Sequence, residues 1–86
     1  MTILEEIDEI KKKIDHMSWI LGELKAFEMK YGLTTGAFVE KWRSSKIPEP
    51  EDHVLLEEFL EWEGLAESLE KVETELKELE NRIRKS

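Results

Sequence analysis

The sequence predicts an all-α protein: a long antiparallel helical hairpin with a short middle helix, which dimerises into a four-helix-bundle or coiled-coil-like assembly. Apolar residues recur every three or four positions in both halves of the chain, as on one face of a helix. A stretch containing glycines and prolines separates these two periodic segments. The 86 residues form one domain, 1–86. Each periodic segment would be about 40–50 Å long as a helix, which is too long for a globule of this size.

The first helix is predicted over about residues 3–31. Thr2 and Glu5 have the spacing of a capping box, in which each side chain satisfies a free backbone N–H of the other. Gly32 follows as a residue suited to the left-handed end of a helix. The apolar residues between them step by four and three, as in a coiled-coil seam. They are Ile3, Ile7, Ile10, Ile14, Met17, Leu21 and Leu24.

A short second helix is predicted over about residues 35–44, with Thr34 or Thr35 as its cap. Pro48 and Pro50 interrupt the chain after it. The third helix is predicted over about residues 51–84, because a proline followed by acidic residues suits the first turn of a helix.

The third helix carries a second seam with the same spacing. Its members from residue 65 onward are Leu65, Leu69, Val72, Leu76, Leu79 and Ile83. Two seams of large aliphatic residues need more cover than two helices give each other, so we expect this chain to form a homodimer. The sequence leaves open whether the two copies run parallel or antiparallel.

All seven aromatic residues lie between positions 19 and 62, so a hairpin brings them together at the end that holds the short helix. Two interpretations remain open for this aromatic head. It is either a small core that holds the short helix in place, or a surface that anchors a partner, because Trp and Tyr contribute strongly to binding. The candidate anchors are Tyr31, Phe38, Trp42 and Trp62.

The formal net charge is −8, and residues 48–86 carry thirteen acidic and five basic side chains. This charge argues against direct binding of nucleic acid, whose phosphates require cations, and against binding to an anionic membrane surface. Most of the acidic residues lie off the seam. They form either a solvated face or a surface for a basic partner, for which Glu58, Glu61 and Glu63 would be the steering charges. We expect a cytoplasmic protein.

The residues indicate no catalytic chemistry. The chain has no cysteine, and its serines have no base placed to activate them. Asp52, His53 and Glu57 include a histidine–carboxylate pair one turn apart, which is a weak candidate for a divalent cation. We therefore expect no enzyme activity, no cofactor and no metal site.

One pattern in the middle of the chain is similar to a known group of proteins. The pattern consists of Leu24, a "FE-x-KYG" helix end at residues 27–32, then Phe38, Trp42 and Asp52, and finally "EW-x-x-L" at residues 61–65. This pattern resembles a group of short, acidic, helical antitoxin-like proteins of archaea and bacteria, which are typically encoded beside a small toxin candidate.

The resemblance implies a non-catalytic protein that binds and masks a small, basic, toxin-like partner. The alternative is a structural homodimer, a coiled-coil scaffold with no obligate partner beyond a second copy. A binder of a small ligand in the bundle core is the weakest hypothesis, because the seams carry no polar residue to orient a ligand.

Overall fold

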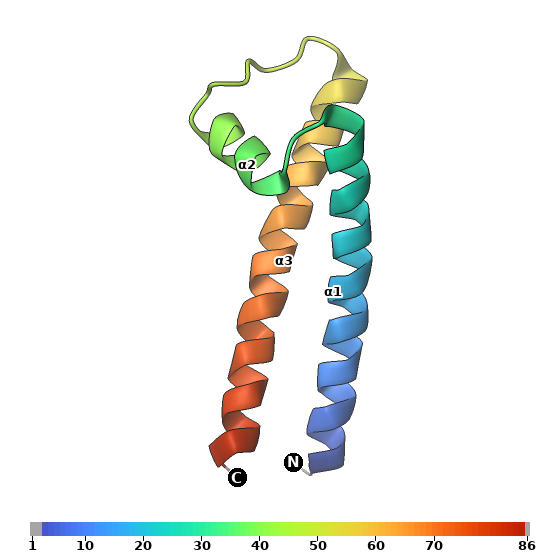
Figure 1. The fold of residues 1–86 in the computed structure, drawn as a ribbon, viewed down its shortest axis with the longest axis vertical. Coiled ribbons are helices and arrows are strands. Elements are labelled where there is room, and N and C mark those ends of the chain that lie inside the picture. The colour runs from blue at the N-terminus through green and yellow to red at the C-terminus, as the bar shows by residue number, and fades with distance from the viewer. Residues whose placement is uncertain (1–2, 86) are drawn as a thin grey trace.

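The computed structural model describes residues 3–85 and shows an all-helical chain of three helices. Helix α1 spans Ile3–Tyr31, α2 spans Thr35–Arg43 and α3 spans His53–Lys85. Figure 1 shows α1 and α3 side by side along their length, with α2 against α3 at the end where the chain turns back. The molecule measures 51 × 21 × 19 Å. The long helices therefore form a stalk, and α2 thickens one end of it.

The start and end of α1 agree with the predicted range of residues 3–31. Thr2, the predicted capping residue, lies outside the described residues. At the other end, the N–H of Gly32 donates to the carbonyl of Glu28 at 2.8 Å, and Gly32 has a φ of 67°. Glycine adopts this left-handed conformation without strain, so the sequence ends α1 at Tyr31.

Side-chain caps determine where α2 and α3 begin. The Thr34 hydroxyl accepts a hydrogen bond from the N–H of Ala37 at 3.2 Å, which makes Thr34 the cap of α2. Asp52 accepts hydrogen bonds from the N–H groups of Val54 and Leu55 at 2.8 and 3.4 Å. Helix α3 consequently begins at His53 rather than at residue 51, because Asp52 acts as its cap and not as part of its first turn.

The predicted seam of α3 packs inward over its whole length. Leu65, Val72 and Leu79 are buried, and Leu69, Leu76 and Ile83 are half-buried. Trp62 continues this line toward the head and is fully buried. The heptad spacing of α3 therefore identified the face that meets α1.

Only part of the predicted seam of α1 packs against α3. Three of its members, Ile10, Met17 and Leu24, are half-buried or buried in the stalk. The other four are largely exposed: Ile3, Ile7, Ile14 and Leu21. The face that α1 buries is instead formed by a different set with the same spacing, namely Glu6, Ile10, Lys13, Met17, Ile20, Leu24, Phe27 and Tyr31.

The aromatic residues at the end of α1 explain this rotation. Phe27 and Tyr31 both stack on Trp62 of α3, with ring centroids 5.5 and 5.7 Å apart. A helix that turns these two rings toward α3 also turns the residues seven positions before each of them in the same direction. Ile20 therefore takes the inward position for which Leu21 was predicted.

The aromatic head is a core around α2. Phe38 of α2 stacks on Trp62 with ring centroids 3.9 Å apart and planes 3° apart, and both side chains have an exposed fraction of 0%. Trp19 is the exception among the aromatic residues, because it is 56% exposed on the stalk and stacks on His16. Among the helices of residues 3–85, none has an apolar stretch that could cross a membrane.

Phe38→Ala tests the role of α2 in this core. Because the ring is fully buried against Trp62, its removal should lower the free energy of unfolding by about 3–5 kcal/mol. Urea denaturation followed by circular dichroism measures this loss. Trp19→Ala is the matched control and should change the stability far less, because Trp19 is exposed. Equal losses in the two variants would contradict the assignment of Phe38 to the core.

Candidate protein-interaction surfaces

The four predicted aromatic anchors lie together in the head, but the structure does not present them equally. Phe38 and Trp62 are fully buried, so neither offers its ring to a partner in this conformation. Tyr31 and Trp42 are half-buried. The indole N–H of Trp62 donates to the hydroxyl of Thr35 at 3.1 Å, which satisfies its polar atom inside the head.

Glu58 belongs to a cluster of charges at the end of the head. It accepts hydrogen bonds from the ammonium group of Lys30, at 2.5 Å, and from the hydroxyl of Tyr31. The hydrogen bond from Lys30, followed by that from Tyr31, lowers the pKa of Glu58. Glu58 in turn raises the pKa of Lys30. Loss of water around the ring, with a smaller effect of Glu58, raises the pKa of Tyr31. Tyr31 and Glu58 were predicted as separate candidates, and no motif of the sequence indicates that they meet Lys30.

The two other predicted steering charges differ in their surroundings. Glu63 is half-buried and lies 3.5 Å from the guanidinium of Arg43, which is also 3.5 Å from Glu67. Arg43 thereby ties the end of α2 to α3. Glu61 is exposed, and of the three predicted charges it is the one most open to solvent.

A line of exposed aliphatic residues runs along one side of α1. Ile7, Ile14 and Leu21 recur every seven residues and are 53%, 46% and 47% exposed, and Ile3 lies on the same side at the end of the helix. We call these four residues the α1 aliphatic line. Aligned exposed aliphatic side chains of this kind are a candidate surface for binding another molecule.

Helix α2 closes the upper end of this line. Glu28, which stands seven residues after Leu21, accepts a hydrogen bond from the backbone N–H of Thr35 at 2.7 Å. Because Thr35 is the first residue of α2, α2 starts on the same side of the hairpin as the α1 aliphatic line. The line is thus open from Ile3 to Leu21 and covered beyond it.

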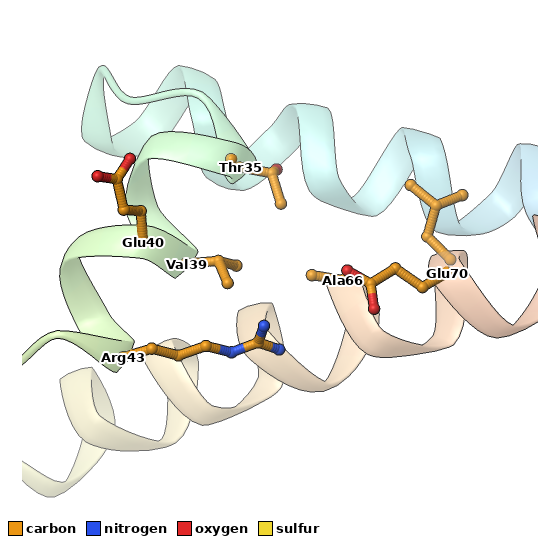
Figure 2. A pocket seen from close by; sticks show the side chains of 8 residues that line it. Thr35, Val39, Glu40, Arg43, Ala66 and Glu70 are labelled. Atoms are coloured by element: carbon orange, nitrogen blue, oxygen red, sulfur yellow. The ribbon is translucent and has the colours of Figure 1, made fainter.

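An open groove of ≈ 510 Å³ lies between α2 and α3 at this point. Figure 2 shows Val39 of α2 and Ala66 of α3 pointing toward one another across it. Arg43, Glu40 and Glu70 place charged groups around it, and Leu69 adds to its apolar lining. Its lining is mostly apolar. No single motif of the sequence indicates this groove, because it depends on how α2 docks on α3.

The α1 aliphatic line ends at the axial level of the groove. Lys13 pairs with Glu75 at 2.5 Å, and Phe27 stacks on Trp62. Leu21 falls between these two pairs and is therefore level with the α3 residues that line the groove, around residues 66–69.

The described residues 3–85 contain no group of three or more His, Cys, Asp or Glu side chains placed to hold a metal ion. No family model, no curated protein and no solved structure matches this chain. Its function is therefore argued from its own surfaces.

Glu58→Gln tests the head cluster through the pH dependence of stability. A carboxyl group with a lowered pKa stabilises the fold above its ordinary pKa of 4.5, and this contribution disappears as the pH falls through the lowered value. The variant should therefore be less stable than the native chain at pH 7. It should also lose less stability between about pH 5 and pH 3. The hydrogen bond from Lys13 also lowers the pKa of Glu75, so the stability of the variant should still fall in part as the pH falls.

Urea midpoints at pH 7, 5 and 3 measure this effect. The matched control is Glu57→Gln, at an exposed position of the same helix turn. A pH profile of Glu58→Gln that coincides with that of the native chain would show that the cluster does not stabilise the fold.

Proposed function

We propose that this protein is a non-catalytic protein–protein interaction module that works through the open sides of its stalk. The observation that carries the proposal is the α1 aliphatic line, exposed beside a head whose largest aromatic side chains are fully buried. In this molecule the large aromatic side chains of the head are packed internally, while aliphatic side chains of the stalk remain exposed. These exposed side chains offer a surface on which another helix or protein can bind.

The first candidate for this function is antitoxin-like: binding and masking a small basic protein. It is supported by the exposed carboxylates of α3, which are Glu57, Glu61, Glu67, Glu70, Glu73, Glu78 and Glu80. Two of these carboxylates form ion pairs, Glu67 with Arg43 and Glu80 with Arg84. An acidic face raises the association rate with a basic partner and disfavours acidic competitors.

The second candidate is a structural homodimer, a helical scaffold without another obligate partner. It is supported by the seven-residue spacing of the α1 aliphatic line, because this spacing allows the line to pack against a second helix. The two candidates rest on different helices, the first on α3 and the second on α1, so substitutions can separate them.

Affinity capture from a native lysate tests the masking function. The tagged native chain should recover one small basic protein in stoichiometric amount, and high salt should release it. Glu57→Lys combined with Glu61→Lys should reduce its association rate by about 10-fold or more at low salt, whereas Ile14→Glu should leave that electrostatic rate effect intact.

Two negative results have different meanings. Recovery of nothing except copies of the chain, with no effect of the α3 substitutions, would exclude masking and leave the homodimeric scaffold. A chain that neither recovers a partner nor associates with itself would contradict the interaction module as a whole.

A further inference from the structure

We propose that the groove between α2 and α3 is the docking site for a basic amphipathic helix of a partner protein. The docked helix inserts an aliphatic side chain between Val39 and Ala66 and places a lysine or arginine next to Glu70. This inference rests on the proposed function, because it assigns a docking site to the basic partner of the masking candidate. It does not involve the α1 aliphatic line.

The groove has room for an aliphatic side chain. Its volume of ≈ 510 Å³ lies within the range of about 300–1,000 Å³ that is typical of binding pockets. Val39 and Leu69 are half-buried at its walls, and Ala66 is buried. A side chain that enters between them leaves water and also covers apolar surface that the hairpin alone does not cover.

The walls of the groove favour a helix over an extended peptide. All eight residues that line it belong to α2 or α3. These walls offer no strand edge, so an extended peptide would gain no hydrogen bonds for its own backbone there. A helix satisfies its own backbone groups and can lay an apolar face into the groove between two other helices.

Two carboxylates without an ion pair stand at the groove, one on each wall. Glu40 of α2 and Glu70 of α3 are both exposed, and neither pairs with a cation among residues 3–85. Glu70 stands one helical turn after Ala66, and Figure 2 shows its carboxylate directed toward that residue. A cation on the docked helix would therefore meet Glu70 beside the apolar wall.

Arg43 is the cation among the residues that line the groove, and α3 balances its charge. Its guanidinium lies 3.5 Å from Glu63 and 3.5 Å from Glu67. The groove and its rim thus carry four carboxylates, Glu40, Glu63, Glu67 and Glu70, against this one guanidinium. This excess of negative charge attracts a basic helix and disfavours an acidic one.

Peptide binding tests the chemistry of the occupant. The probe is a helical peptide of about 14 residues made of lysine, leucine and alanine, with a leucine at every third or fourth position. Its counterpart has glutamate in place of each lysine. Calorimetric titration of the full chain should give a dissociation constant below about 100 µM for the lysine peptide. The glutamate peptide should bind at least about 10-fold more weakly.

Two outcomes of this titration would overturn the proposal. One is the absence of binding by the lysine peptide at about 1 mM. The other is equal binding of the two peptides, which would show that charge does not select the occupant.

Gly36→Leu tests the place of binding. Gly36 lines the groove, and a Cβ added there meets no atom within 4 Å, so leucine can fill the groove without straining the fold. Leucine also favours a helix more than glycine does. The variant should bind the lysine peptide at least about 10-fold more weakly than the native chain does, and circular dichroism should show that it remains helical.

Gly64→Leu is the matched control for this substitution. Gly64 of α3 also has no atom within 4 Å of an added Cβ, but it is not among the residues that line the groove. Its variant should bind the lysine peptide within about twofold of the native chain. Equal weakening by the two leucines, or no weakening by Gly36→Leu, would refute the groove as the docking site.

Glu70→Gln tests the cation that the docked helix places there. Loss of one exposed ion pair should weaken binding of the lysine peptide about 2–5-fold, and about 1 M salt should remove this difference. Glu78→Gln is the control, at an exposed position of α3 two turns further along, and should have a smaller effect. Equal effects of the two substitutions would contradict the contact with Glu70.

Backbone amide chemical shifts separate this inference from the proposed function. Shift changes centred on Gly36, Val39 and Leu69 would support the groove. Changes centred on the α1 aliphatic line, with binding retained by Gly36→Leu, would refute the groove and retain the interaction module. A chain that binds neither peptide and captures no partner would refute both. A native dimer that Gly36→Leu dissociates would assign the groove to a second copy and refute the basic partner.

Discussion

The packing of Trp62 determines how the rest of the molecule is arranged. Its indole ring lies flat against Phe38 of α2 and stacks on Phe27 and Tyr31 of α1, so all three helices meet on one side chain. Its N–H donates to Thr35, the first residue of α2. This one residue therefore fixes the place of α2 and the rotation of α1 about its own axis.

The rotation of α1 continues along the stalk because α1 is one uninterrupted helix of 29 residues. Because Phe27 faces α3, Ile20 and Lys13, which stand seven and fourteen residues before it, face α3 too. Lys13 is accommodated by its ion pair with Glu75. Ile14 is left on the outside at 46% exposed. A well-packed head thus coexists with a stalk that is only partly apolar inside.

The sequence predicts the helices well, and local chemistry explains why. The capping by Gly32 and Thr34 and the heptad spacing of α3 depend only on residues that are close together in the sequence. They can therefore be recognised without a structure. The phase of α1 could not be predicted in the same way, because the predicted and the observed sets share Ile10, Met17 and Leu24, and only contacts in the head select between them. The groove beside Val39 depends on the same long-range packing and has no local signal.

The head and the open side of the stalk are two consequences of one constraint. A hairpin whose α1 turned Ile7 and Ile14 toward α3 would have a fully aliphatic seam, but it would turn Phe27 away from Trp62. Aromatic packing beyond the burial of area, about 0.5–1.5 kcal/mol for each ring pair, favours the rotation that is observed. A single chain therefore cannot bury both sets of side chains. The second set therefore stays at the surface, and the interaction module that we propose rests on this exposed set.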